Sequence, residues 1–448
     1  MSTEIKRRER DAIIQSLQAG LVPRQGLHLI QVGRKEEVQA VLNDLERLEE
    51  GGAAFRIVVG RFGCGKSFFL NLVRSLALQK RMVVAQADIT MERRLHATGG
   101  QCRALYSELM RNLAIKSKPD GGALRNLCEG WISNIQHEVK SNGGDDEEVK
   151  KRIYDDLKDL QDHVGGFEFA EVLAQYYEGF ATGSDHQQGS ALRWLRAEFN
   201  NKTEANQELG VRRIISDDNF YDSLKLMAAF CRKAGYQGLL VNLDELVVLS
   251  HRLPSSRARQ TNYEAILTML NDCLQGTVEG LGFLLAGTNE FLEDKRRGLY
   301  SYEALRSRLA TNEFVAEGVK DFSGPTLQLP SLSAEDLFVL LRNIRHVHAG
   351  GDPEKYIVPD EALMGVLQKA NETLGAEFYK TPRDIVRSFV GLLNVLEQNP
   401  DRKWDEFVKD GFGKAPESAQ SIEEAIERGE EPEADTGDED DDLASFKL

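Results

Sequence analysis

The sequence contains few cysteines, and none are paired in the spacing of a metal knuckle. Its 448 residues include five cysteines, an odd number, scattered without a Cys-x-x-Cys pair at Cys64, Cys102, Cys128, Cys231 and Cys273. A disulfide framework needs an even set of cysteines, and a zinc knuckle needs closely paired ones. Both classes are excluded, and we expect reduced thiols.

Long apolar runs are also missing. The longest ones, Gly280–Gly287 and Gly238–Leu243, have the length of a strand and fall far short of the roughly 18 residues that a membrane-spanning helix requires. The segment Met1–Asp11 is charged throughout and lacks the apolar core of a secretion signal. We therefore expect a cytoplasmic protein that makes no membrane contact.

Acidic residues outnumber basic ones, but most of this excess lies in one segment near the C-terminal end of the sequence. The formal net charge is −16, and the segment from Glu417 to Leu448 holds thirteen acidic residues against two basic ones. This segment accounts for −11 of the charge and leaves −5 for the rest of the chain. We expect residues 413–448 to be a disordered acidic tail. The net charge of the whole chain therefore does not argue against a nucleic-acid partner.

The order of apolar segments predicts an α/β fold with a parallel sheet. Continuous apolar runs of buried-strand type occur at 55–59, 82–87, 239–243, 281–286 and 326–329. Helical periodicity lies between them, at 38–48, 66–78 and 262–274, and an amphipathic helix is expected at 4–19. Leu27–Val32 is interpreted as an extended stretch. Strands that alternate with helices favour a parallel sheet covered on both faces.

Two helical regions interrupt or follow this alternation. Residues 91–235 are expected to form a large helical insertion, with interruptions at 121–122, 143–148, 165–166 and 183–189. After Pro330 the pattern predicts helices at 333–346, 359–373 and 381–397. The predicted organisation is a nucleotide-binding domain over 1–330, a helical lid over 331–412 and the acidic tail over 413–448.

The strongest functional signal is a phosphate-binding loop. The segment from Gly60 to Ser67 fits GxxxxGK[ST], directly after a predicted strand and at the start of a predicted helix. Its backbone N–H groups would surround phosphate oxygens, the Lys66 ammonium would neutralise the β- and γ-phosphates, and the Ser67 hydroxyl would bind Mg²⁺. The predicted nucleotide-binding residues here are Gly60, Gly63, Cys64, Gly65, Lys66, Ser67 and Phe68.

Two carboxylates follow another buried strand, at Asp244 and Glu245. The carboxyl end of a parallel strand is where such sheets present ligands. Asp244 is expected to hold Mg²⁺ through water, and Glu245 to orient and deprotonate the attacking water, a role that a hydrolase requires. The alternative is that the pair only caps the next helix.

Polar residues after the fourth expected strand and in the lid complete the candidate set. Thr288 or Asn289 could reach the γ-phosphate and the attacking water, unless Asn289 only forms a turn. Arg306 or Arg308 could be presented to a neighbouring subunit's nucleotide, and Arg383 follows the helix start Thr381-Pro382 and could point toward nucleotide. Surface ion pairing is the alternative for these arginines.

Two further patterns are set aside. His346 and His348 form an isolated His-x-His near a helix end without a third ligand, which is typical of surface histidines. The basic segment Lys6–Arg10 is short and interrupted by Glu9, which favours a solvated helix face.

In these residues the chain resembles the AAA+ ATPases. The motifs occur in the order that this family shows. Gly33-Arg34 resemble its N-terminal box, residues 60–67 its Walker A motif and Asp244-Glu245 its Walker B motif. Thr288-Asn289 resemble its sensor 1, Ser307-Arg308-Leu309 its arginine finger and Arg383 its sensor 2. Residues 20–110 and 210–400 are similar to the BrxD-like ATP-binding proteins of BREX phage-defence systems. The likeness to origin-recognition and helicase-loading ATPases is more distant.

The resemblance implies more than the residues alone. It implies a sheet of order 5-1-4-3-2, ATP and Mg²⁺ as cofactors, Gly33 and Arg34 beside the nucleotide, and a homo-oligomer with shared active sites. Glu245, Asn289, Arg308 and Arg383 would then be catalytic, with Arg308 acting in trans and Arg383 in cis. Two features depart from the family: the insertion at 91–235 is unusually long, and no winged-helix domain follows the lid, which argues against autonomous sequence-specific DNA binding.

The resulting hypothesis is an ATP-hydrolysing protein of bacterial antiphage defence. It would load or remodel a defence complex on DNA, with other defence-system proteins as partners. The first alternative is an ATP-dependent switch or scaffold that acts on protein partners without DNA. The second is a P-loop kinase, which Glu245 and the sensor positions disfavour.

Overall fold

A parallel sheet forms the centre of the molecule. The computed structural model describes residues 5–310, 312, 320–372 and 381–411. Within these ranges the sheet has five strands in the order β2-β3-β4-β1-β5, and all neighbours are parallel. The strands are β1 (Ala54–Val59), β2 (Val83–Asp88), β3 (Leu239–Asp244), β4 (Leu281–Gly287) and β5 (Thr326–Gln328). The predicted α/β class and the order 5-1-4-3-2 are confirmed.

The register of the strands brings their carboxyl ends to one edge. Val59 of β1 pairs with Gly287 of β4, and Asp88 of β2 pairs with Asp244 of β3. The phosphate-binding loop leaves β1 at this edge, and the segments after β3 and β4 leave it there too. In a parallel sheet this is the edge at which ligands bind.

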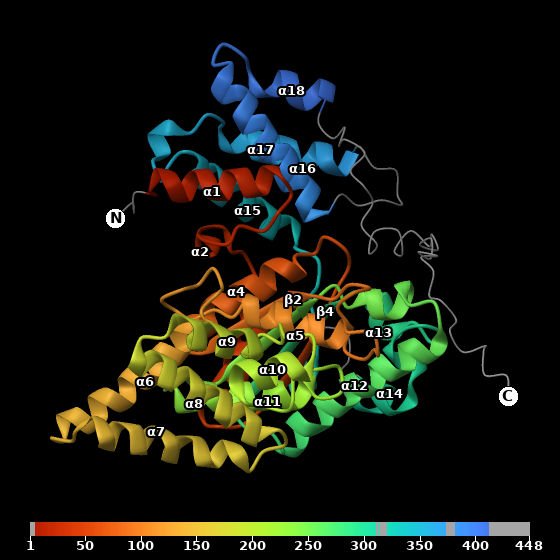
Figure 1. Cartoon of the computed structure of the whole chain (residues 1–448). Coiled ribbons are helices and arrows are strands. Elements are labelled where there is room, and N and C mark those ends of the chain that lie inside the picture. Colours follow the sequence, from red (N-terminus) through yellow and green to blue (C-terminus); the bar gives the residue numbers. More distant parts are fainter. Residues whose placement is uncertain (1–4, 311, 313–319, 373–380, 412–448) are drawn as a thin grey trace.

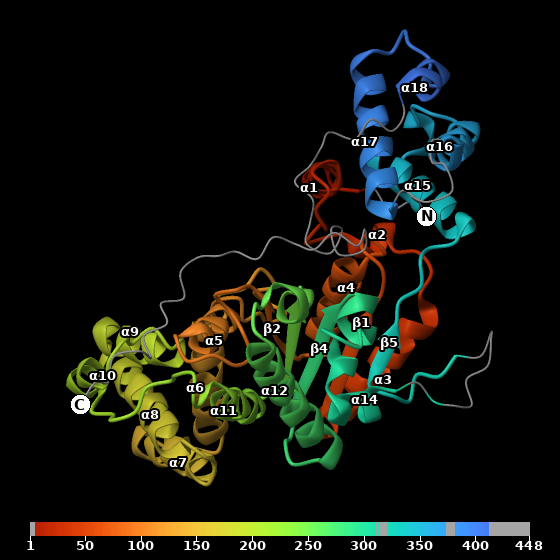
Figure 2. The same ribbon diagram turned by 90° about the vertical axis from the view of Figure 1, so that its right-hand side faces the viewer.

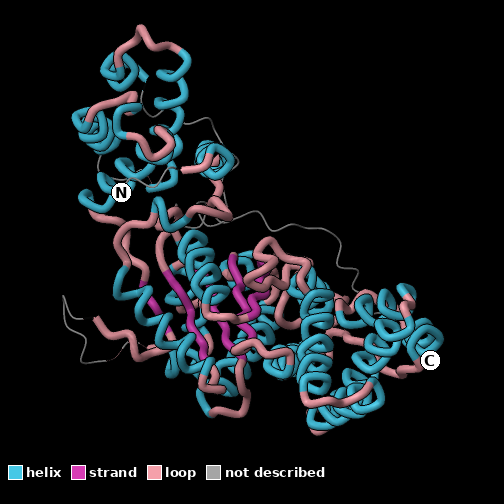
Figure 3. Tube along the Cα trace, turned by 90° about the vertical axis from the view of Figure 1, so that its left-hand side faces the viewer, coloured by secondary structure: helices cyan, strands magenta, loops and turns pink. Residues whose placement is uncertain are grey.

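Helices lie on both sides of the strands (Figure 3), and alternate strand residues pack into two different cores. Ala54 and Val58 of β1 belong to a core with α3 (Lys35–Glu49) and α4 (Lys66–Gln79). Phe55 and Ile57 point into a second core, which includes residues of α12 (Ser256–Gln275). Both faces are covered, and this explains why the strand sequences are continuously apolar.

The region between β2 and β3 is a helical insertion that shares the second core with the sheet. In Figure 2 it extends from the β2 side of the sheet, away from β5. Its helices are α5 (Gln101–Arg111), α6 (Leu124–Ser141), α7 (Asp146–Gln161), α8 (Gly166–Thr182), α9 (Asp185–Leu195), α10 (Lys202–Leu209) and α11 (Phe220–Lys233).

Two of the interruptions expected in this insertion are too long. Asp145 and Glu148 form a capping box, so the acidic residues from 146 onward already belong to α7. Ser184 caps α9 in the same way by accepting a hydrogen bond from the Gln187 N–H. Acidic and small polar residues at these positions start helices instead of separating them.

A separate helical cluster lies beyond the carboxyl edge of the sheet (Figure 1). It contains α15 (Ala334–His348), α16 (Asp360–Glu372), α17 (Pro382–Gln398) and α18 (Trp404–Gly411), which we call the lid. The N-terminal helices α1 (Arg7–Gln18) and α2 (Leu27–Ile30) contribute Ile13, Ile14 and Ile30 to the same core, and Ile5 joins it from just before α1. The lid core is therefore built from both ends of the described chain.

The expectation of an extended stretch at Leu27–Val32 is wrong. Gly26 adopts a left-handed conformation, with φ of 71°, and the chain then forms the single turn α2. Leu27 and Ile30, three residues apart, are both buried. Spacing of three places side chains on one face of a helix, whereas the apolar composition alone did not distinguish a helix from a strand.

Short elements follow the third and fourth strands. The π-helix η1 (Val248–Arg252) lies between β3 and α12, and α13 (Asn289–Glu293), the 3₁₀ turn η2 (Leu299–Ser301) and α14 (Glu303–Leu309) lie between β4 and β5. A further 3₁₀ turn, η3 (Pro353–Lys355), connects α15 to α16. Across the described residues, no helix combines the length and apolar character needed to cross a membrane.

A buried ion pair joins the first helix of the α/β unit to the sheet. The Arg56 guanidinium in β1 donates from Nε to Asp44 Oδ2 at 2.6 Å and from Nη2 to Asp44 Oδ1 at 3.2 Å. Its Nη1 donates to the Phe322 carbonyl at 2.7 Å and to that of Gly324. One side chain thus fixes α3, β1 and the segment that leads into β5.

We expect Arg56→Met to lower the free energy of unfolding by about 3 kcal/mol or more, because it leaves the Asp44 carboxylate buried without its partner. Urea denaturation measures the change. Adding Asp44→Leu should recover part of the loss. As a control, Arg402→Ala removes an exposed pair with Glu406 and should change stability by less than about 1 kcal/mol. Equal effects of Arg56→Met and Arg402→Ala would contradict this account.

Candidate nucleotide-binding site

The loop between β1 and α4 has the shape of a phosphate cradle. Gly63 and Gly65 adopt left-handed conformations, with φ of 70° and 98°, and Gly65 caps the start of α4. A Cβ atom at Gly63 would lie 2.4 Å from Thr381 Cβ in the lid. Glycine at this position therefore permits both the turn and the close approach of the lid.

The lysine of the loop is buried against it. Lys66 Nζ donates to the carbonyl oxygens of Gly60 and Arg61, each at 3.1 Å. The ammonium therefore lies at the mouth of the cradle formed by the loop backbone. At this place it could bind anionic phosphate oxygens, in line with its predicted role.

Oxygen donors of the kind that Mg²⁺ prefers lie next to the loop. Ser67 Oγ donates to Asp244 Oδ2 at 2.7 Å, so the first turn of α4 and the end of β3 are in direct contact. Asp88 pairs with Asp244 across the strands, and its pKa is raised by burial and by the negative charge of Asp244. A hydroxyl beside carboxylates fits a hard divalent cation.

Glu245 has an unusual backbone conformation. It has φ of 60°, a left-handed conformation that costs a residue with a side chain about 1 kcal/mol or more. Its N–H donates to Asp244 Oδ1 at 2.9 Å, and the residue lines the same pocket as the phosphate loop. Strained residues of this kind cluster at functional sites, where the surrounding structure holds them.

The two candidates after β4 have different surroundings. Thr288 is fully buried, and its hydroxyl accepts a hydrogen bond from the Phe291 N–H, which caps α13. Asn289 is half-buried, and its Oδ1 has no hydrogen-bond partner among the residues that the structure describes. Thr288 is thus occupied with local structure, whereas the Asn289 amide is the side chain that could contact a ligand.

The lid contributes Arg383 to the pocket. Arg383 lies in the first turn of α17, and its guanidinium stacks over the Phe62 ring at 5.1 Å from the centroid. Thr381 and Asp384 form a capping box that fixes this turn. The structure therefore brings Arg383 together with the loop, as the sequence predicted from the helix start.

Arg34 connects the loop to the base of the lid. Its Nη2 donates to the Cys64 carbonyl at 2.6 Å and to the Pro330 carbonyl at 2.9 Å. Burial lowers the pKa of this guanidinium, and its Nη1 is buried with no hydrogen-bond partner in the described part of the chain. Gly33, just before it, lies against Asp336 of α15. Arg34 is thus placed to respond to a ligand in the pocket.

Apart from Phe68, the apolar half of the pocket was missed by the sequence analysis. Between the loop and the lid the pocket is lined by Leu17, Leu21, Val22, Pro23, Ile30, Val32, Phe62, Phe68, Leu332, Leu340, Pro382 and Val386. An apolar slot beside a phosphate cradle suits a flat base attached to phosphates. Only Pro23, which breaks the chain after α1, offered a signal, and it did not indicate that this segment folds back over the loop.

Arg306 and Arg308 lie elsewhere. Both are exposed on α14, and neither is among the described residues that line the pocket. Arg308 donates from Nε to Asn271 Oδ1 at 2.8 Å and from Nη1 to the Ala304 carbonyl at 2.8 Å, whereas Arg306 lies 3.5 Å from Glu303. The structure does not bring these arginines to the site of their own chain.

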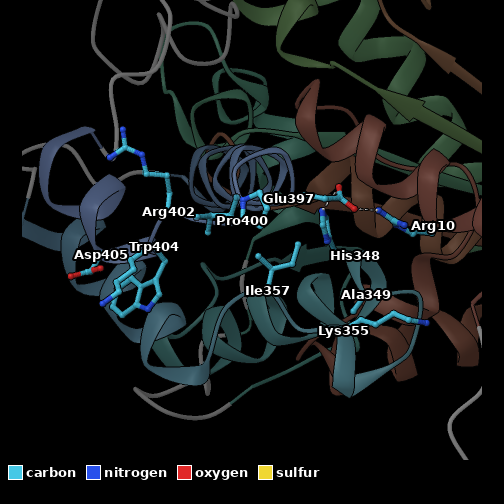
Figure 4. A pocket seen from close by; sticks show the side chains of 12 residues that line it. Arg10, His348, Ala349, Lys355, Ile357, Glu397, Pro400, Arg402, Trp404 and Asp405 are labelled. Atoms are coloured by element: carbon cyan, nitrogen blue, oxygen red, sulfur yellow. Dashed lines mark hydrogen bonds and ion pairs between the residues drawn. The ribbon is translucent and has the colours of Figure 1, made fainter.

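A second cavity, of about 550 Å³, lies inside the lid (Figure 4). Three of the cations that line it have acidic partners: Arg10 pairs with Glu397 at 3.1 Å, Lys355 with Asp352 at 3.0 Å and Arg402 with Glu406 at 3.1 Å. His348 points toward Glu397, and no metal-binding cluster occurs among the described residues. We therefore assign the nucleotide to the pocket at the loop and not to this cavity.

Comparison with known proteins shows the family of this chain. The family model described as "BREX system ATP-binding protein BrxC/D" matches residues 5–411, which include the sheet, the insertion and the lid. No curated protein matches the chain.

We expect Gly63→Ala to weaken ATP binding at least tenfold, because the added methyl group strains the left-handed turn and collides with Thr381, and about 1.4 kcal/mol corresponds to a factor of ten. Titration of a fluorescent ATP analogue measures the affinity. Gly210→Ala is the matched control: its φ of 71° is the same, but no atom lies within 4 Å of the added carbon. It should bind ATP like the unmodified protein. Normal affinity in Gly63→Ala would contradict the proposed contact between lid and loop.

Proposed function

The chain belongs to the BREX system ATP-binding protein BrxC/D family, and on this premise we propose that it is a Mg²⁺-dependent ATPase of a BREX defence system. The observation that carries the proposal is the contact between Ser67 and Asp244 at 2.7 Å, with Glu245 next to it. A protein that only binds ATP has no need of a carboxylate in a strained conformation beside the cradle.

The pocket suggests how ATP would bind. The phosphates would lie in the loop from Gly60 to Ser67 against the Lys66 ammonium, and the base would enter the apolar slot. Arg383 would reach the phosphates from the lid, and the unpartnered Nη1 of Arg34 would donate from the other side. The ligand would thus touch both the α/β unit and the lid, and its binding would draw the two together.

Mg²⁺ would be held by Ser67 directly and by Asp244, in part through water. The cation would neutralise phosphate charge as the γ-phosphate leaves. Asp88 adds a third oxygen donor at the same edge, and its pKa is raised first by burial and then by the negative charge of Asp244. A cation would relieve this repulsion, which supports a metal at this place.

Hydrolysis would depend on the two side chains that flank the site. Glu245 would accept a proton from the attacking water, and the Asn289 amide would hold that water in line with the γ-phosphate. The exposed Arg308 or Arg306 of a second copy would supply the remaining positive charge. This part of the proposal requires a homo-oligomer with sites at shared interfaces, because neither arginine lines the pocket of its own chain.

We further propose that turnover loads or remodels a defence complex on DNA, with other proteins of the BREX system as partners. Family membership supports the partners from the BREX system, and the action on DNA is proposed on the resemblance alone. An ATP-dependent switch that acts on proteins without DNA is the alternative, and the assay below separates the two.

Steady-state ATP hydrolysis tests the proposal. We expect the unmodified protein to turn over ATP, faster at higher protein concentration and with double-stranded DNA. Lys66→Ala should lose both binding and turnover, whereas Glu245→Gln should bind ATP normally and not hydrolyse it, because the amide cannot take a proton. EDTA should abolish turnover. Tight binding with negligible turnover under every condition would exclude the ATPase and favour the switch.

Mixing inactive variants tests the shared interface. Lys66→Ala and Arg308→Ala should each be inactive, but an equal mixture should regain about a quarter of the activity, because one interface in four then joins an intact Lys66 to an intact Arg308. The same mixture with Arg306→Ala identifies which arginine is supplied in trans. Mixtures that stay inactive although the subunits co-assemble would exclude sites shared between copies.

A further inference from the structure

A buried polar chain lies beside the proposed site without being part of it. Ser250 Oγ lies 2.7 Å from His251 Nδ1, and His251 Nε2 lies 3.5 Å from Asp294 Oδ2. Ser250 is fully buried, and the His251 side chain is 8% exposed. The residue types are those of a hydrolase triad, but a serine closed off from solvent cannot attack a substrate. The chain must serve another purpose.

One end of this chain continues from the proposed general base. The Val248 N–H donates to the Glu245 carbonyl at 3.1 Å, and Ser250 Oγ contacts the Val247 carbonyl at 2.9 Å. His251 therefore extends from the same turn that holds Glu245 in its left-handed conformation. The turn continues as the π-helix η1, a rare element that is frequent at functional sites.

The other end continues to the proposed water-positioning residue. Asp294 follows directly after α13, the helix that begins at Asn289. Its Oδ1 accepts from the backbone N–H groups of Arg296 and Arg297, at 2.7 and 3.1 Å, and Oδ2 remains for His251. Since α13 is a single short turn, fixing Asp294 also restrains Asn289.

The groups around His251 limit the hydrogen bonds that its imidazole ring can make. Burial lowers the pKa of His251, against the opposing effect of Asp294 and with Arg297 and Glu290 also nearby. A neutral ring carries one N–H, and the Asp294 carboxylate can only accept. The Ser250 hydroxyl donates its single proton to the Val247 carbonyl, so both Ser250 Oγ and Asp294 Oδ2 face the ring as acceptors, and a neutral ring donates to one of them at a time. The histidine is a bridge between two elements.

We propose that His251 is a positioning residue that fixes the Glu245 turn relative to the Asn289 helix. This inference rests on the proposed ATPase activity. If Glu245 and Asn289 hold one water between them, the relative position of the segments that follow β3 and β4 decides whether that water is in line with the γ-phosphate. The strands themselves are held by their hydrogen bonds, and the His251 contact with Asp294 joins the segments that follow them. His251 is not among the described residues that line the pocket.

The test compares kcat with nucleotide affinity. We expect His251→Ala to lower kcat about tenfold or more, since small displacements of reacting groups are costly, while the affinity for a non-hydrolysable ATP analogue stays within twofold. His251→Gln keeps a donor in reach of Asp294 and should recover part of kcat. His251→Asn places its polar atoms near Ser250 only and should resemble His251→Ala. If the alanine variant fails to fold, the comparison of kcat between His251→Gln and His251→Asn tests the proposal.

His348→Ala is the matched control. His348 is equally buried, and its Nε2 also lies 3.5 Å from a carboxylate, that of Glu397, but it lies in the lid cavity of Figure 4. It should lower stability without lowering kcat at saturating ATP. Equal kcat in the unmodified protein and all three His251 variants would overturn the positioning role alone. Absence of turnover in the unmodified protein would overturn the ATPase proposal as well, so the two failures are distinguishable.

Discussion

The parallel register of β1, β4 and β3 is the constraint on which the rest of the structure depends. Because Val59 pairs with Gly287 and β3 lies in register with β4, three chain segments leave the sheet at one edge. The phosphate loop, the two carboxylates and Asn289 meet there although up to about 230 residues separate them. The Arg56–Asp44 pair and the covered faces of the sheet maintain this register.

The pocket is completed by the lid, which is built from both ends of the described chain. Helices α1 and α2 pack with the lid helices (Figures 1 and 2). Leu21 and Arg383 therefore line one pocket together with the loop. Arg34 joins the loop to the start of the lid segment through the Cys64 and Pro330 carbonyls. A ligand that fills the pocket would contact all of these parts. Under the proposed function, the position of the lid would therefore depend on whether nucleotide is bound.

Near the carboxyl ends of β3 and β4, a strained backbone conformation occurs beside a buried polar contact. Glu245 is held in an unfavourable backbone conformation, and the buried contact of His251 with Asp294 connects the segments after β3 and β4. The strands themselves are held together by their hydrogen bonds, whereas the segments after them have no ladder, so this contact restrains the part that the sheet does not. The segments after β3 and β4 share their hydrophobic core with the helical insertion, which packs on the same face of the sheet.

The sequence alone determined the fold class, and it supplied most of the residues on which the proposed chemistry rests. Continuous apolar runs specify buried parallel strands, and GxxxxGKS and Asp244-Glu245 predict phosphate and metal binding through local rules of backbone geometry and charge. Patterns within a few residues could not decide between a helix and an extended stretch at Leu27, or between Thr288 and Asn289. They also gave no sign that α1 packs with the lid, that Arg34 bridges two carbonyls or that His251 meets Asp294. These contacts join residues distant along the chain, and only the packing of complete elements brings such residues together.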